Sequence, residues 1–185
     1  GGSKGTFSGT DGDSSYSLIV TPDADSSGTI TVDVPAAAAL DAAGNSTSAQ
    51  QATQAFDTAS PSVVISDDTS GTAVGDVTFT FTFSEAVYGF TSDDITLSSG
   101  SKGTFSGSDG NSSYSLIVTP DANSSGTITV DVPAAAALDA AGNSNTAATQ
   151  ATQAFDTESP TVVISDDTSG TATGDVSFSF NFSED

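Results

Sequence analysis

The stretch VTFTFTF, residues 77–83, alternates without exception between an apolar residue and threonine. Successive side chains of a β-strand point to opposite faces, so this period of two predicts a strand with one valine and three phenylalanines on a single face. Burying the three rings contributes about 1.5 to 3 kcal/mol each, which is enough to anchor a core. The stretch therefore predicts a half-buried strand in an all-β protein.

Six further short stretches around this strand have the same character. They are SVVIS (62–66), DITLS (94–98), KGTFSG (102–107), SYSLIVTP (113–120), GTITVDVP (126–133) and TQAFD (152–156). Clusters of Asp, Asn, Ser and Gly separate them, as turns require. Seven short strands in about 99 residues predict an immunoglobulin-like β-sandwich of two sheets, here without the cysteine pair or the tryptophan of antibody domains.

The sequence contains this unit more than once. Residues 3–46 return as residues 101–144 with three substitutions, and FDT at 56–58 returns at 155–157. A period of about 98–99 residues is too long for a solenoid repeat and indicates independent domains in tandem. We therefore expect the last five strands of one repeat in residues 1–58, a complete repeat in residues 59–157 and the first two strands of the next in residues 158–185.

The composition is strongly acidic. The 185 residues include 24 acidic residues against two lysines, with no histidine, for a formal net charge of −22. Phosphate groups repel such a chain, which excludes nucleic acid and anionic membranes as partners. No apolar run approaches the roughly 18 residues of a membrane span, so we expect no direct membrane insertion. The chain also lacks cysteine, and it therefore needs no disulfide framework.

The acidic residues gather at the ends of the predicted strands. If the strands run between the two ends of a sandwich, each connection belongs to one of two poles. One pole receives Asp67, Asp68, Asp76, Asp121 and Asp156, and the other receives Glu85, Asp93, Asp94, Asp109 and Asp139. The joint Asp156-Thr157-Glu158 then brings one pole against the opposite pole of the next repeat, which carries Glu184 and Asp185.

Crowded like charges destabilise a protein unless a cation lies among them, and this chain has almost no cations of its own. Carboxylate and carbonyl oxygens, without His or Cys, are the ligands of calcium. We therefore predict that Ca²⁺ fills the joints between repeats and stiffens the array. The candidate ligands from this reasoning are Asp67, Asp68, Asp156, Glu158, Glu184 and Asp185.

Three of the acidic motifs also have a plain structural interpretation. The SDD motif at 66–68 is a good turn former through its own backbone N–H groups. PDANSSG (120–126) matches the opening of a calcium loop, but Val132 stands at the closing twelfth position where such a loop needs glutamate, which favours a hairpin turn. DAAGN, at 41 and again at 139, favours a self-bonded turn with glycine at positive φ.

The set SPTVVISDDTSGTATGDVSFSFNFSE, GFTSDDITL and VPAAAALDAAGN resembles the bacterial Ig-like repeats of large surface adhesins exported by type I secretion. The resemblance covers essentially the whole chain. It implies an extracellular, calcium-rigidified extender on the bacterial cell surface, which holds a terminal binding domain away from the cell in attachment or biofilm formation. By motif position it implies Asp57, Glu85, Asp93, Asp94 and Asp156 as joint ligands. The RTX nonapeptide of such secretion tails does not occur in these residues.

Other functions compete with the extender. A catalytic role is not expected, because the chain has neither a histidine base nor a cysteine, and paired carboxylates for glycoside hydrolysis lack an aromatic cleft. A glycan- or protein-binding module, or plain solvation of a halophilic protein, stays open. A further hypothesis is that the tail 158–185 of one copy completes the head 1–57 of another, which would give an end-to-end fibre.

Overall fold

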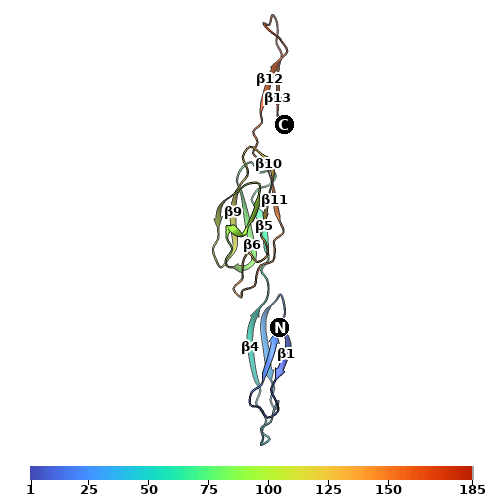
Figure 1. The fold of residues 1–185 in the computed structure, drawn as a ribbon, viewed down its shortest axis with the longest axis vertical. Coiled ribbons are helices and arrows are strands. Elements are labelled where there is room, and N and C mark those ends of the chain that lie inside the picture. Colours follow the sequence, from blue (N-terminus) through green and yellow to red (C-terminus); the bar gives the residue numbers. More distant parts are fainter. Residues whose placement is uncertain (185) are drawn as a thin grey trace.

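The computed structural model, of which residues 1–184 are described, shows three bodies arranged along one long axis (Figure 1). The first unit, strands β1–β4, lies at one end, and the middle unit, strands β5–β11, lies at the centre. The last hairpin, strands β12 and β13, projects from the other end. The order of the bodies along the axis follows the order of the repeats in the sequence.

The middle unit is a two-sheet sandwich of seven strands. They are β5 (Val63–Asp67), β6 (Val77–Val87), β7 (Thr96–Ser98), β8 (Ser101–Ser106), β9 (Asn111–Thr119), β10 (Ser125–Asp131) and β11 (Ala151–Asp156), with a 3-10 turn at Ser92–Asp94. One sheet has the order β5-β6-β9-β8 and the other β11-β10-β7. This is the strand order of an immunoglobulin constant-type domain, and it confirms the predicted fold class.

The core forms between the inward faces of the two sheets. Phe79 and Phe81 in β6 are fully buried, as are Ile128 and Val130 in β10. The threonines that alternate with the phenylalanines of β6 lie on the other face, as the period of two predicts. The ring of Phe90 fills the space between the sheets, edge-on to Phe81 at a centroid distance of 5.6 Å.

The first unit contains four strands: β1 (Ser3–Ser8), β2 (Ser17–Thr21), β3 (Ser27–Val34) and β4 (Gln50–Asp57). They are the counterparts of β8–β11, and the pair Ser27–Asp57 repeats the register of the pair Ser125–Asp156. The expectation of five strands in residues 1–58 is wrong by one strand. Gly2 aligns with Gly100, so β7 has no counterpart there.

The last hairpin pairs β12 (Val162–Asp166) with β13 (Phe178–Phe182), which are the two strands expected in residues 158–185. Its register is that of β5 and β6, because Val162 faces Phe182 as Val63 faces Phe83. The PDANSSG turn connects β9 and β10, which belong to different sheets. The predicted hairpin turn is therefore wrong, because this turn leads the chain from one sheet to the other. Among the described residues, no helix has the length and apolar character to cross a membrane.

Candidate metal centre at the joint between units

Three carboxylates meet where the first unit joins the middle unit. Asp57 ends β4, Glu85 lies near the end of β6, and Asp139 opens the turn between β10 and β11. One carboxylate oxygen from each residue lies within 4.8 Å of the others. We call Asp57, Glu85 and Asp139 the acidic triad. One member comes from the first unit and two from the middle unit, so the triad exists only when the two units are in contact.

Glu85 belongs to the core-facing side of its strand. Every second residue of β6 from Val77 points inward, and this alternation places Glu85 between the buried Phe83 and Val87. The regular pairing of β6 with β9 is interrupted between Thr82 and Val87, as at a β-bulge. The result is a half-buried carboxylate near the end of the apolar row, close to the carboxylates of Asp57 and Asp139.

Asp139 is fixed by the DAAGN turn that it opens. Its Oδ1 accepts hydrogen bonds from the backbone N–H groups of Ala141 and Asn143, both at 2.8 Å. Its Oδ2 accepts one from the Asn143 side chain, also at 2.8 Å. Gly142 supplies the positive φ of 93° that closes the turn. The predicted self-bonded turn is therefore confirmed, and it holds a carboxylate that is only 4% exposed.

The chain that links the two units is anchored on both sides. On the first unit, the Thr58 hydroxyl donates to the carbonyl of Asp23 at 2.6 Å, and its backbone N–H donates to Ser26 at 2.9 Å. On the middle unit, the carbonyl of the buried Pro61 accepts the N–H of Thr146 at 2.8 Å. Only Ala59 and Ser60 lie between these anchors, so the freedom of the joint is confined to very few torsions.

The electrostatics of the triad are unfavourable without a cation. Burial, and then the charges of Asp139 and Asp57, raise the pKa of Glu85. For Asp139, burial is the largest influence and raises the pKa, but the hydrogen bonds from Asn143, Ala141 and Gly142 outweigh it and the pKa is lowered. The one ion pair among residues 1–184 joins the N-terminal amine to Asp23 at 3.9 Å and includes no member of the triad.

The ligand set of the triad fits a hard divalent cation. All three side chains offer carboxylate oxygens, and His and Cys are absent from the chain. Calcium is bound by such oxygen sets in flexible geometry, whereas magnesium demands near-ideal octahedral sites. Asp139 is held by its turn and Glu85 by strand β6, so two of the three candidate ligands have fixed positions.

Comparison with known families agrees with the fold of the middle unit. The family model described as Bacterial Ig-like domain matches residues 57–155. The chain belongs to the bacterial Ig-like domain family. The match begins at the triad residue Asp57 and includes Glu85 and Asp139. Searches of curated proteins and of solved structures give no match.

Within this bacterial Ig-like domain, the SDD motif forms the turn that the alternative interpretation predicted. Asp67 Oδ1 accepts the N–H of Thr69 at 3.0 Å, and Asp68 Oδ1 accepts the N–H of Thr78 at 2.9 Å. The Thr78 N–H is the main cause of a lowered pKa at Asp68. Asp167 repeats the same bond to Ser177 at 3.1 Å in the last hairpin. A ligand role for Asp67 and Asp68 stays a prediction.

Asp93 and Asp94 lie in the 3-10 turn of the Ig-like domain, outside the triad. Asp94 Oδ2 accepts bonds from both the N–H and the hydroxyl of Thr91, each at 2.8 Å, in a capping box. Asp93 is exposed beside it. The Asp94 carboxylate therefore caps its own turn. Neither Asp93 nor Asp94 belongs to the triad, and their predicted role as ligands stays a prediction.

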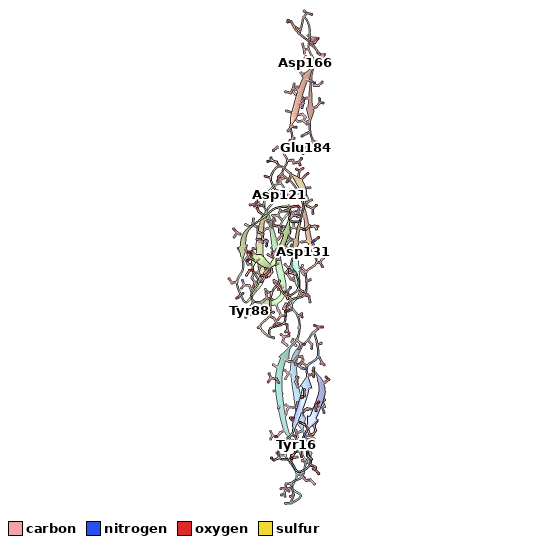
Figure 2. All side chains as sticks on the ribbon, viewed as in Figure 1. Tyr16, Tyr88, Asp121, Asp131, Asp166 and Glu184 are labelled. Carbon is pink, nitrogen blue, oxygen red and sulfur yellow. The ribbon has the colours of Figure 1, made fainter. Side chains whose placement is uncertain are left out.

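The remaining predicted ligands belong to the second joint, between the middle unit and the last hairpin. Asp156 Oδ1 accepts the N–H of Glu158 at 3.0 Å, just as Asp57 Oδ1 accepts that of Ala59. Figure 2 shows Glu184 at the end of the hairpin that adjoins the middle unit, with Asp166 farther out. The predicted ligand Asp185 lies outside the described residues.

Asp139 is the one triad residue that the sequence reasoning did not select as a ligand. The sequence places Asp139 at the same pole as Glu85, but the DAAGN motif accounts for it as a turn residue. The turn uses three N–H donors on its two oxygens, and each carboxylate oxygen has further lone pairs. A residue can therefore serve the turn and the metal centre together.

Proposed function

We propose that this chain is a structural extender of a bacterial cell-surface adhesin, in which calcium bound at the joints keeps successive Ig-like domains in line. The extender projects a distal binding domain in attachment or biofilm formation, and it has no catalytic role. The observation that carries this proposal is the acidic triad, because Asp57 comes from one unit and Glu85 and Asp139 from the next.

The physical argument is a balance between repulsion and bridging. Three carboxylates with oxygens within 4.8 Å of one another repel, and the repulsion is relieved by opening the joint. A divalent cation reverses the sign of this interaction, since it attracts ligands from both units at once. The anchors at Thr58 and Pro61 leave only a short link, so closing the joint costs little chain entropy.

A linear shape suits the proposed role. The three bodies lie along one axis, with the first and last repeats at opposite ends of the middle unit (Figure 1). A rod of this kind gains length with each repeat only if its joints do not bend. The second joint carries the same Asp-Thr-x-Ser-Pro sequence, 156–160, as the first at 57–61. A long array would thus repeat one stiffened connection.

The experiment measures the distance across the joint. The chain has no cysteine, so Ser14→Cys and Ser70→Cys place spin labels on exposed loops of the first and middle units. In calcium the distance distribution is expected to be narrow, and in chelator broad. Asp139→Asn should stay broad in calcium, whereas Asp11→Asn, which removes the same charge at an exposed residue of the first unit, should behave as the parent. Equal widths with calcium and chelator would contradict stiffening.

Calcium binding is measured separately by calorimetry. The parent chain is expected to release heat on binding and Asp139→Asn to lose that signal. Calcium at about 100 times its Kd raises the free energy of unfolding by about 2.7 kcal/mol, so the melting temperature should rise as well. A chain that neither binds calcium nor melts higher with it would favour plain solvation by acidic residues. Retention of a glycan by the calcium-free chain would favour the binding module instead.

A further inference from the structure

The first and last segments of the middle unit are hydrogen-bonded directly to each other. Residues 71–73, which follow β5, lie beside β11, and Ala73 forms a parallel bridge with Phe155. The N–H of Ala73 donates to the carbonyl of Ala154 at 2.9 Å, and the N–H of Asp156 donates to the carbonyl of Ala73 at 2.8 Å. Because β5 and β11 belong to different sheets, this bridge joins the two sheets by backbone hydrogen bonds.

The side chain of Gln153 strengthens this bridge. It occupies an inward position of β11, where an apolar residue is the usual choice, and it is 6% exposed. Its Nε2 donates to the carbonyl of Gly71 at 2.5 Å and to that of Ala154 at 2.8 Å. A buried amide is stable only with its hydrogen bonds made, so Gln153 fixes residues 71–73 against β11. We call the contact between residues 71–73 and 153–156 the lock.

A second contact joins the same two segments before either strand begins. The carbonyl of Pro61, ahead of β5, accepts the N–H of Thr146, ahead of β11, at 2.8 Å. Residues 61–73 and 146–155 therefore run in the same direction along one side of the sandwich and are bonded at both ends. Pro61 and Ala73 are both buried, so the two contacts are part of the packed domain.

Tension along the rod enters and leaves the middle unit through these two segments. The chain enters the unit at Pro61 and leaves it after Asp156, and its neighbours on the two sides lie at opposite ends (Figure 1). Pulling on the neighbours draws residues 61–73 toward one end and β11 toward the other. Parallel segments pulled in this way slide along each other, so their bonds must break together. A hairpin opened from one end loses its bonds one at a time and resists less.

We propose that the lock is the element of this Ig-like domain that resists tension along the rod, and that Gln153 is the residue that positions it. Strand β11 cannot be drawn out of the sandwich until the lock opens, because its last residues are bonded to Ala73 as well as to β10. The lock lies inside one domain and includes no residue of the acidic triad, so it does not depend on calcium. That an attached cell loads the domain rests on the proposed function; the lock itself does not.

Single-molecule pulling on the full chain tests the lock in two directions. The chain has no cysteine, so Ser60→Cys and Ser159→Cys attach handles at exposed residues on either side of the middle unit, and force then acts along the axis. In the second geometry the handles are at Ser60→Cys and Ser108→Cys, and Ser108 is an exposed residue beside the end of β6. That force opens the β5–β6 pair from the pole of the first joint and reaches the lock last.

Two variants open the lock. Ala73→Pro removes the N–H that donates to Ala154, and Gln153→Leu removes the amide but keeps a side chain of similar size. The control for the proline is Val74→Pro, at an exposed residue whose N–H makes no hydrogen bond among residues 1–184. At the same axial force, each lock variant is expected to unfold about tenfold faster than the parent. The control along the axis, and all three variants in the second geometry, should stay within about twofold of the parent.

Equal acceleration in the two geometries would overturn the proposal, because it would show that Ala73 and Gln153 add stability without resisting a particular direction of force. Lock variants that unfold along the axis at the rate of the parent would overturn it as well. If Ala73→Pro does not fold, Gln153→Leu decides alone. The ratio of axial rates should be the same in calcium and in chelator. A ratio that persists while the spin-label distances ignore calcium would retain the lock and reject calcium stiffening, and the opposite pair of results would reject the lock alone.

Discussion

The side chain of Asn143 and the backbone of Asp57 are hydrogen-bonded across the joint between the first and middle units, at 3.3 Å. The same Asn143 amide donates to Asp139 Oδ2 at 2.8 Å. One side chain therefore holds a triad carboxylate in its turn and also contacts the preceding unit. The DAAGN turn of the Ig-like domain therefore also contacts the unit that precedes it.

Asn143→Ala should weaken both the turn and the joint. It removes a bond to a carboxylate and a bond to a carbonyl, and we expect a loss of about 1 to 2 kcal/mol in the free energy of unfolding together with weaker calcium binding. Asn45→Ala is the matched control, since Asn45 donates to Asp41 at 2.8 Å within the first unit. Denaturant unfolding and calorimetry measure the two effects. Equal losses of calcium affinity in the two variants would show that the contact with Asp57 is irrelevant.

Glu85 should make stability depend on pH when calcium is removed. Burial, Asp139 and Asp57 raise its pKa, so the folded chain holds the proton more tightly than the unfolded chain. The stabilisation is complete below the ordinary pKa and is lost as the pH rises through the raised one. Melting temperature in chelator should therefore fall across this window in the parent, and Glu85→Gln should flatten the dependence. Identical pH profiles would show that Glu85 does not titrate as the geometry requires.

The strands were predictable because their signal is local. The alternation at 77–83 sets which face of β6 enters the core, and Asp- and Gly-rich turns mark the strand ends. The exception was the number of strands in residues 1–58. That number depends on where the repeats align: Gly2 aligns with Gly100, which follows β7, so these residues contain no counterpart of β7. Sheet order followed from the seven-strand fold class.

The acidic triad was only partly predictable because its members converge from distant points of the chain. Glu85 and Asp57 were selected as ligands, but which other carboxylate meets them depends on side-chain direction at the pole. Asp94 lies at the same pole as Asp139, but its carboxylate accepts a hydrogen bond from the Thr91 hydroxyl instead of joining the triad. Asp139 was explained by its turn alone, and nothing in the sequence distinguishes its free lone pairs from those of Asp41.

Tyr114→Phe should destabilise the middle unit. The buried Tyr114 hydroxyl lies 2.9 Å from the carbonyl of Ser108 and 3.0 Å from that of Val87, and so connects the β8–β9 loop to the end of β6. The two carbonyls keep backbone donors in Gly110 and Asn111, so the loss is that of one net hydrogen bond, about 0.5 to 1.5 kcal/mol. Tyr16→Phe is the control in the first unit, because Tyr16 donates to Thr10 from a half-exposed position. Urea unfolding compares them, and equal midpoints would contradict the prediction.

Phe90→Ala should have the largest effect on the middle unit. Phe90 is 3% exposed and its ring lies edge-on to four other aromatic rings, with centroid distances from 5.0 Å to Phe83 to 5.8 Å to Phe105. Truncation removes these contacts and leaves a cavity that the two sheets cannot close, because each is held by its own backbone hydrogen bonds. The expected loss is about 3 to 5 kcal/mol in the free energy of unfolding. Val74→Ala, at an 84% exposed residue of the same unit, should stay within about 0.5 kcal/mol of the parent. Chemical unfolding followed by near-ultraviolet circular dichroism measures both, and a loss below 1 kcal/mol for Phe90→Ala would mean that the sheets do collapse onto the space.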